Sequence, residues 1–263
     1  MSEGKKEILL GDCLELMKDI PNGSIDMILC DLPYGTTAFI WDTIIPFDKL
    51  WEQYERIIKP NGAIVLTASQ PFTSALVMSN PKLFKYEIIW DKTFSSNPFL
   101  LPCRIHESIL VFYKNKGTYN PIYSDRPIKE QRPNSRGIGK VKINTYNDNV
   151  FGNTTKGHSD KFDDKKVSPK SIIKIHKHPA KLGLHPTQKP IELFEYLIKT
   201  YTNEGDLVLD NTAGSGTTAI ACLNTKRQFI VMEQDPNYFE KIKKRVADFN
   251  KNFEPQTLFG NEM

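Results

Sequence analysis

Short apolar runs alternate along the chain with segments in which apolar residues recur at helical spacing. The runs are of strand length and several contain β-branched residues, which predicts buried strands. They are Glu7–Leu10, Ile25–Leu29, Ala63–Thr67, Tyr86–Trp90, Ser108–Tyr113, Leu207–Asp210 and Phe229–Met232. Strands that alternate with helical patterns are typical of an α/β fold, so we expect a mostly parallel sheet flanked by helices.

Helical spacing marks segments that lie between or beside these strands. The segments are Leu14–Ile20, Phe47–Ile58, Leu193–Tyr201, Ala219–Leu223 and Tyr238–Phe249. Pro21-Asn22-Gly23 is a stop signal for the first segment, and Lys59-Pro60-Asn61-Gly62 is one for the second. Pro190 suits the start of the helix that contains Leu193. The regular pattern therefore occupies both ends of the chain and leaves the middle unassigned.

The middle segment, residues 115–183, differs from both ends in composition and charge. It is rich in Lys, Asn, Ser, Pro and Gly and shows little periodicity. Between Lys114 and Lys181 there are 16 lysines and arginines against six aspartates and glutamates, although the net charge of the 263-residue chain is only +4. Basic residues interleaved with aromatic ones are typical of a nucleic-acid contact surface. A solvated linker or flexible insertion is the alternative.

Composition also bears on compartment, membrane and metal. No long apolar run indicates a membrane span, and the polar start of the chain, Met1–Lys6, lacks the apolar core of a signal peptide. The four cysteines are scattered without a Cys-x-x-Cys pair, which favours buried thiols in a reducing cytoplasm over disulfides or zinc. His176 and His178 lie two positions apart on a basic stretch, where contacts with solvent or phosphate are expected rather than a metal.

The first candidate site is the run Asp31-Leu32-Pro33-Tyr34-Gly35, which directly follows a predicted strand. Pro-x-Gly ends the strand, and ligands of open α/β sheets bind at the carboxyl ends of strands. A carboxylate and nearby backbone carbonyls can accept the N–H bonds of a planar amine while an aromatic ring stacks on its face. The alternative is an ordinary strand-end turn in which Tyr34 packs and Asp31 caps a neighbour.

The second candidate site is a glycine-rich turn after another strand. Residues 210–218 have the sequence Asp-Asn-Thr-Ala-Gly-Ser-Gly-Thr-Thr and lead into a helix, whose N-terminus offers unpaired N–H groups. Glu233 ends the next strand roughly 20 positions after Asp210, the offset at which an acid reaches ribose hydroxyls. Ala219 replaces the third glycine of the dinucleotide pattern, and no Gly-Lys-Ser/Thr follows. We therefore expect a nucleoside ligand with an appendage smaller than a pyrophosphate.

Three motifs together resemble those of amino-DNA methyltransferases. Residues 210–218 resemble their S-adenosylmethionine loop, and residues 31–34 resemble their catalytic Asp-Pro-Pro-Tyr motif. Residues 185–190 match the His-Pro-Thr-Gln-Lys-Pro segment of the permuted β-group, in which the catalytic motif precedes the recognition region and the cofactor loop. The resemblance covers everything except the basic insert. It implies a Rossmann-like methyltransferase sheet with a catalytic half (1–114), a target-recognition insert (115–183) and a cofactor-binding half (184–263).

The resemblance also implies catalytic roles. The catalytic set is Asp31, Leu32, Pro33 and Tyr34. Asp31 and the Leu32 carbonyl would accept the N–H bonds of an exocyclic amine, and Tyr34 would stack on the base after it leaves the duplex. Leu32 departs from the motif by replacing its first proline, but leucine keeps the carbonyl.

Cofactor binding is assigned by the same resemblance, and no metal is needed. The set is Asp12, Asp31, Thr187, Lys189, Asp210, Ala213, Gly214, Ser215, Gly216, Thr217, Glu233 and Gln234. Glu233 would take the ribose hydroxyls, and Asp12 would meet the adenine. Thr187 and Lys189 would lie near the carboxylate of the cofactor. A second departure is Asn211-Thr212, where the family commonly has Pro-Phe, and the missing phenylalanine is expected to weaken cofactor packing.

The implied function is methyl transfer from S-adenosylmethionine to the N6 amine of adenine in a specific double-stranded DNA sequence. Aspartate at the first motif position favours adenine within the family, whereas cytosine-N4 relatives more often carry serine. Cytosine-N4 methylation, methylation of RNA or a protein amide, and a catalytically dead DNA-binding protein are the alternatives. The family analogy further suggests a homodimer and raises a cognate restriction endonuclease as a partner.

Overall fold

The computed structural model describes residues 5–36, 42–93, 102–125, 166–176 and 188–253. The chain forms two compact units, one made of residues 1–120 and 170–263 and the other of residues 121–169. In the second unit, strands β6 (Ser124–Asp125) and β7 (Lys166–Val167) pair antiparallel, and Lys166 Nζ lies 2.6 Å from Asp125 Oδ1. This unit spans fewer residues than the expected insert, 121–169 against 115–183.

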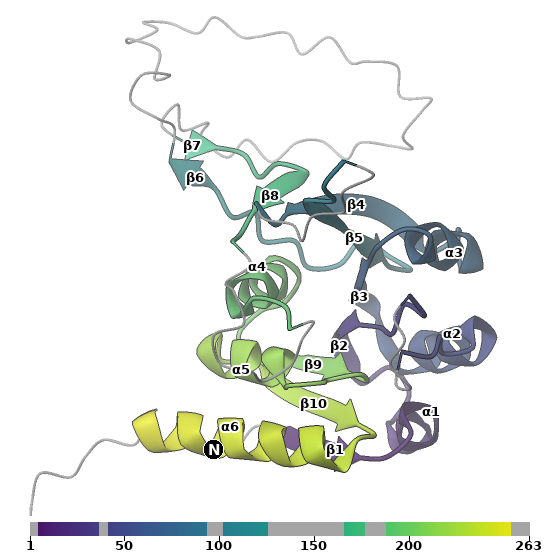
Figure 1. Cartoon of the computed structure of the whole chain (residues 1–263), viewed down its shortest axis with the longest axis vertical. Helices are drawn as coiled ribbons and strands as arrows, with labels where there is room; N and C mark the ends of the chain where they lie inside the picture. Colours follow the sequence, from purple (N-terminus) through teal and green to yellow (C-terminus); the bar gives the residue numbers. More distant parts are fainter. Residues whose placement is uncertain (1–4, 37–41, 94–101, 126–165, 177–187, 254–263) are drawn as a thin grey trace, which may run out of the picture. The chain divides into compact units, whose positions relative to one another are not determined.

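Eight strands form the sheet of the first unit, in the order β1-β10-β9-β2-β3-β5-β4-β8 (Figure 1). Their bounds are β1 (Lys6–Leu10), β2 (Ile25–Asp31), β3 (Ile58–Ala68), β4 (Phe84–Asp91), β5 (His106–Phe112), β8 (Ile172–Lys174), β9 (Leu207–Asp210) and β10 (Gln228–Glu233). Among these strands β5 alone runs against the others, because it pairs antiparallel with both β3 and β4. The predicted α/β fold with a mostly parallel sheet is therefore confirmed.

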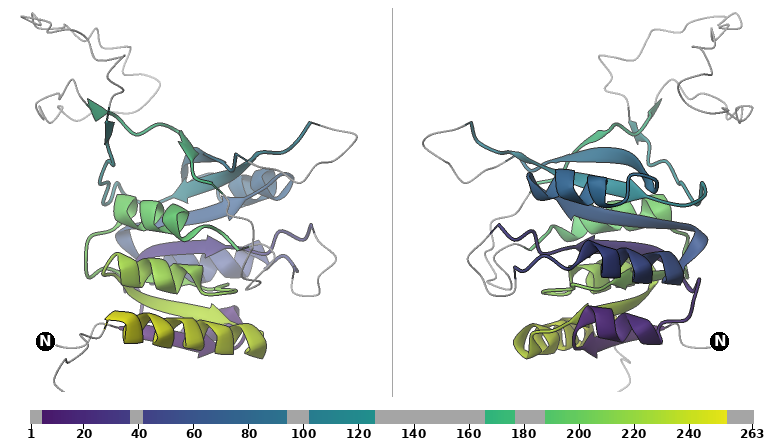
Figure 2. Two further views of the ribbon diagram at one scale, coloured as in Figure 1. Left: turned by 60° about the vertical axis from the view of Figure 1, so that its left-hand side comes forward. Right: turned by 90° about the vertical axis from the view of Figure 1, so that its right-hand side faces the viewer.

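Helices cover both faces of this sheet (Figure 2). On one face lie α1 (Cys13–Leu16), the short 3-10 turn η1 (Met17–Asp19), α2 (Phe47–Ile57) and α3 (Phe72–Ser79); on the other lie α4 (Ile191–Tyr201), α5 (Thr217–Asn224) and α6 (Pro236–Phe253). Strand β2 serves both cores, because Ile28 packs in the first and Met27 and Leu29 pack in the second. Burial on both faces explains why its sequence is a continuous apolar run.

The stop signal that the sequence placed after α2 lies inside a strand. Strand β3 begins at Ile58, directly after α2, and contains Lys59, Pro60, Asn61 and Gly62. The register against β2 jumps here, since Ile25 pairs with Ile58 but Met27 pairs with Ala63. A bulge of this kind accommodates proline and glycine in a strand. The turn residues therefore mark an irregularity of the ladder and not a loop.

The ends of the expected insert belong to the first unit. Tyr119 packs against Tyr201 of α4 with ring centroids 6.4 Å apart, and the Asn120 side-chain amide donates to the Lys199 and Thr202 carbonyls at the end of that helix. Strand β8 pairs with β4 at the edge of the main sheet.

In the described ranges, no helix is both long and apolar enough to cross a membrane.

Gly216 generates a prediction about packing. It precedes α5 at φ +80°, and a Cβ there would lie 3.0 Å from two side-chain carbons of Ile242 in α6. Gly205 has a similar φ of +86° but nothing within 4 Å. Alanine at either position costs about 1–2 kcal/mol of left-handed backbone strain, and crowding against Ile242 adds about 1–3 kcal/mol. We expect Gly216→Ala to lower the free energy of unfolding by more than Gly205→Ala in urea titrations. Equal losses would contradict the crowding.

Candidate active site

The carboxyl ends of β1, β2, β9 and β10 meet at one cleft of about 1290 Å³ in the first unit. Parallel strands end at the same edge of a sheet, which is why residues distant in sequence converge there. The predicted site residues that line it are Asp12, Asp31, Leu32, Pro33, Tyr34, Lys189, Asp210, Ala213, Gly214, Ser215, Thr217, Glu233 and Gln234. Gly216 is not among the lining residues, because it faces Ile242. Thr187 lies outside the described residues.

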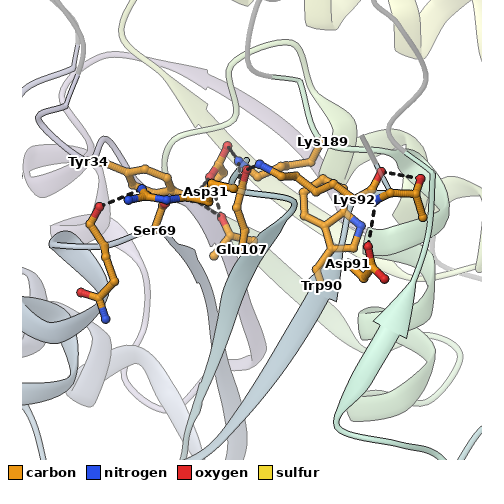
Figure 3. A network of polar contacts seen from close by, with 12 residues as sticks. Asp31, Tyr34, Ser69, Trp90, Asp91, Lys92, Glu107 and Lys189 are labelled. Carbon is orange, nitrogen blue, oxygen red and sulfur yellow. Dashed lines mark hydrogen bonds and ion pairs between the residues drawn. The ribbon is translucent and has the colours of Figure 1, made fainter. Parts of the chain in front are cut away.

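Asp31 is the last residue of β2, and both oxygens of its carboxylate are held (Figure 3). Oδ1 accepts hydrogen bonds from the hydroxyls of Thr67 (2.5 Å) and Tyr34 (2.8 Å). Thr67 is the residue of β3 that pairs with Asp31 in the ladder. Oδ2 accepts from Lys189 Nζ at 2.6 Å. The carboxylate is thus fixed in orientation by three donors from three parts of the chain.

Tyr34 is held by its ring as well as by its hydroxyl. The ring stacks on Phe72 of α3, with centroids 5.1 Å apart and planes 24° apart. Lys189 Nζ lies 5.5 Å from the ring centroid, within cation–π range. Burial, reinforced by the charge of Asp31, raises the pKa of the Tyr34 phenol well above its ordinary value. Tyr34 therefore stays protonated and donates to Asp31, and its stacking on a base stays a prediction.

The turn after Tyr34 is closed by Asp42. Gly35, at φ +66°, donates its N–H to Asp42 Oδ1, and Thr36 donates to Oδ2, both at 2.9 Å. From the sequence, Asp42, like Trp41, is expected either to line the pocket of the target base or to anchor its loop. It lines the cleft and anchors the turn, whereas its neighbour Trp41 lies outside the described residues.

Lys189 lies between two carboxylates (Figure 3). Its ammonium contacts Asp31 Oδ2 at 2.6 Å and Glu107 Oε2 at 3.3 Å, and its side chain is only 6% exposed. Burial alone lowers the pKa of Lys189, but Asp31, Tyr34 and Glu107 outweigh it and raise the pKa well above its usual value. The ammonium stays charged, and the pairing predicted between Lys189 and a cofactor carboxylate stays a prediction.

Glu107 is a charged residue of the cleft that the sequence did not assign to the site. From the sequence, the His106-Glu107 pair precedes a strand and is expected to have a packing role, with positioning of the recognition region as the alternative. The structure places Glu107 in β5, where Oε1 lies 3.0 Å from Lys92 and Oε2 faces Lys189. The available signal was an acidic residue next to the buried apolar run Ser108–Phe112, because a charge beside such a run needs a partner.

Glu233 ties the glycine loop to the neighbouring strand end. Its Oε2 accepts the Gly214 N–H at 2.8 Å, and its Oε1 accepts the Asp235 N–H at 2.9 Å. Burial raises its pKa, although these backbone hydrogen bonds lower it in part. Asp12 caps α1 by accepting from Leu14 and Glu15 through Oδ1. Both acids therefore shape the cleft wall at which a nucleoside is expected.

Asp210 acts inside the loop rather than at its surface. Its side chain accepts from the Thr218 hydroxyl and from the Thr212 N–H at 3.0 Å, and the residue is 2% exposed. This arrangement folds the loop back onto the end of β9. Burial raises the pKa of Asp210 to about 7, with the two hydrogen bonds opposing the shift.

The two loop residues that depart from the family pattern, Asn211 and Thr212, make polar links around the end of β2. Asn211 Oδ1 accepts from the Tyr54 hydroxyl at 2.6 Å and from the Cys30 thiol at 2.8 Å. The Thr212 hydroxyl donates to the Asp31 carbonyl at 3.1 Å. The Asn-Thr pair therefore joins the loop to β2. From the resemblance, only weaker packing of the cofactor was expected at these two positions.

The donors and acceptors of the cleft suit a nucleoside better than a metal. The carboxylates of Asp12 and Glu233 lie beside a glycine turn in the cleft. They can accept hydrogen bonds from the hydroxyls of a ribose and the amine of a base. Within the described ranges no group of three His, Cys, Asp or Glu residues is arranged to hold a metal ion.

Comparison with known proteins agrees with this geometry. A family model described as a DNA methylase matches residues 25–244. Type II methyltransferase M.HpaI of Haemophilus parainfluenzae is 27% identical over 93% of this chain and 76% of that protein. DNA adenine methyltransferase YhdJ of Escherichia coli (strain K12) is 27% identical over 92% of this chain and 82% of that protein. The crystal structure of the M1.HpyAVI–SAM complex, 26% identical, matches with a TM-score of 0.59 over 91% of this chain and 98% of that one.

The raised pKa of Asp210 predicts a pH dependence of stability. In the unfolded chain this carboxyl titrates near its ordinary pKa of about 4. Between there and about pH 7 the native state holds a proton that the unfolded state has lost. The contribution is complete below about pH 4 and is lost as the pH rises through about 7. We expect the free energy of unfolding to fall more steeply with pH in the unmodified protein than in Asp210→Asn. Parallel curves from urea titrations across this range would contradict the assignment.

Proposed function

The chain belongs to the N6_N4_Mtase family of DNA methylases, and from this premise we propose that it methylates the N6 amine of adenine in a specific double-stranded DNA sequence. The methyl donor is S-adenosylmethionine. The observation that carries the proposal is the fixed carboxylate of Asp31, which shares one cleft with the glycine loop. The name of YhdJ supports adenine as the base, and the M1.HpyAVI–SAM complex supports the donor.

Asp31 and Leu32 would activate the amine. The lone pair of an exocyclic amine is delocalised into the ring, so the amine is a poor nucleophile until its N–H bonds are held by acceptors. The Asp31 carboxylate and the Leu32 carbonyl supply two such acceptors at the end of β2. They orient the nitrogen so that its lone pair points across the cleft toward the glycine loop. Holding the reactants in this geometry is the main contribution of the protein.

The cofactor would lie against the loop after β9 and the acids at the ends of β1 and β10. When bound, S-adenosylmethionine supplies an electrophilic methyl group on a sulfonium. Glu233 would hold the ribose hydroxyls, and Asp12 would meet the adenine through Oδ2, since its two hydrogen bonds among the described residues use Oδ1. The loop residues Ala213, Gly214 and Ser215 would face the methionine part.

Cytosine-N4 methylation is the nearest alternative, because both amines need the same acceptors. The family label itself covers N6 and N4 amines. Adenine is proposed on the likeness to YhdJ and on aspartate at the first motif position. The permuted β-group assignment also stays a prediction, as do the roles of the basic segment in sequence recognition.

We expect Asp31→Ala to abolish most of the methylation. Loss of a charged acceptor for the amine lowers the transfer rate by about ten- to a hundredfold or more. The measurement is nucleoside mass spectrometry of DNA from a host without DNA methylation that expresses either form. Asp26→Ala is the matched control, because Asp26 lies in the same strand and pairs with Lys59 at 2.6 Å, yet it does not line the cleft.

Each product points to a different conclusion. N6-methyladenine that persists in the Asp26 variant and is lost with Asp31→Ala supports the proposal. N4-methylcytosine would keep the mechanism and overturn the base. An absence of any methylated DNA base, with cofactor binding intact, would overturn DNA as the substrate.

Cofactor affinity tests the role of Glu233. We expect Glu233→Gln to raise the Kd for S-adenosylmethionine by about tenfold, because the amide loses the charge-assisted hydrogen bonds to the ribose hydroxyls. Isothermal titration calorimetry measures it. Glu204→Gln is the control, since Glu204 is exposed and pairs with Lys226 away from the cleft. Matching Kd values for the two variants would contradict the role.

Partners and location complete the proposal. The likeness to M.HpaI, which is named a Type II methyltransferase, supports a restriction–modification setting with a cognate endonuclease. The homodimer rests on family analogy, and light scattering on the purified chain would test it. We also propose a cytoplasmic location, where DNA is accessible and the scattered cysteines meet reducing conditions.

A further inference from the structure

Four side chains of alternating charge form a row that begins at Asp31 in the cleft. Asp31, Lys189, Glu107 and Lys92 follow one another with contacts of 2.6, 3.3 and 3.0 Å (Figure 3). Lys189, Glu107 and Lys92 are all at most 14% exposed. Charges in such an interior need partners, because desolvation of an unpaired one is costly. The row is therefore balanced as a unit, and no member can leave its partner without finding another.

The contacts of Asp31 within this row limit its ability to accept the target amine. Asp31 Oδ1 already accepts from two hydroxyls, and the one acceptor site left on Oδ2 lies beside the ammonium that this oxygen already accepts from. A neutral adenine amine competes poorly with a positively charged donor, whose hydrogen bonds to a carboxylate are about twice as strong as neutral ones. In the observed arrangement, Asp31 is therefore a weak acceptor for the target.

Glu107 is an alternative acceptor for the Lys189 ammonium. Its Oε2 is buried and has no hydrogen-bond partner among the described residues, although it lies only 3.3 Å from Lys189 Nζ. A movement of about half an ångström, with the ammonium turned toward Oε2, would shorten the contact to the roughly 2.8 Å of a charge-assisted hydrogen bond. Lys92 pairs with the other oxygen, Oε1, at 3.0 Å, which leaves Oε2 to Lys189.

We propose that Glu107 is a positioning residue that receives the Lys189 ammonium from Asp31 when the target amine arrives. The exchange frees Asp31 Oδ2 to accept the amine N–H and satisfies Glu107 Oε2 in the same movement. No charge enters or leaves the row. The proposal rests on the proposed function, because it assigns the event that prepares Asp31 for its substrate.

The test compares two DNA duplexes that differ by one amine. Both carry the sequence that methylation mapping of the expressing host identifies, with adenine or purine at the target position. Purine lacks the N6 amine and makes no demand on Asp31, so the ratio of the two Kd values reports the Asp31–amine contact. Fluorescence anisotropy measures the Kd values, and single-turnover assays on the adenine duplex measure the rate.

Glu107→Gln should reduce the preference for adenine over purine and slow the single-turnover rate, each by about tenfold. A neutral amide accepts the ammonium less well, so Lys189 stays on Asp31. Binding of the purine duplex and of S-adenosylmethionine should stay unchanged. An adenine preference and a rate equal to those of the unmodified protein would overturn the proposal.

A double variant is expected to change adenine preference in the opposite direction from Glu107→Gln alone. Glu107→Gln combined with Lys189→Met removes one charge of each sign and leaves Asp31 with its hydroxyl donors only. If Glu107 acts by receiving Lys189, the double variant regains adenine preference relative to Glu107→Gln alone. If Glu107 only supports the fold, the second change deepens the loss, and the proposal is overturned.

Lys92→Met tests the exchange in a protein that retains both Glu107 and Lys189. Without the ammonium on Oε1, Glu107 becomes a better acceptor for Lys189, so adenine preference should equal or exceed that of the unmodified protein. A fall would contradict the exchange even if Glu107→Gln does not fold. Failure of the proposed function is distinguishable, because the unmodified protein would then produce no N6-methyladenine at all.

Discussion

The ion pair between Asp31 and Lys189 is the contact on which the rest of the site depends. It joins the end of β2 to the residue before the proline that caps α4, across 158 positions of sequence. Both groups lie largely out of water, where a lone charge costs several kcal/mol or more. The chain must therefore close this contact when it folds. Closing it brings the end of β2 and the start of α4 together.

A second constraint comes from the pairing of β2 with β9. Because Ile28 lies beside Leu209 in parallel register, Asp31 and the loop after Asp210 leave the sheet at the same edge. Asn211 and Thr212 then bond to Cys30 and to the Asp31 carbonyl. These links hold the loop beside the end of β2, which is the arrangement that the proposed transfer needs. The polar pair thus contributes position where Pro-Phe would contribute apolar contact.

Much of this arrangement could be predicted from local sequence, and the part that could not depends on register. Apolar runs indicated the strands because both faces of the sheet are covered, and Asp31 and Glu233 were found because they end such runs. Glu107 was missed, because its importance depends on Lys189, which lies far away along the chain. Helix α3 was missed too, since its apolar residues do not form a one-sided stripe. Gly216 was assigned to the cofactor by its motif, and this role stays a prediction; local sequence could not show that Ile242 lies against it.

The acids of the cleft show why motif and structure must be considered together. Glu233 binds the Gly214 and Asp235 N–H groups, so the residue expected to hold the ribose also orders the glycine loop. A ligand hydroxyl on Glu233 would add to those backbone hydrogen bonds, because a carboxylate has about four acceptor sites. Asp210 differs, since it is buried beneath the loop and is held by Thr212 and Thr218. Of these two strand-end acids, Glu233 can therefore share its oxygens with a ligand, whereas Asp210 shapes the loop from within.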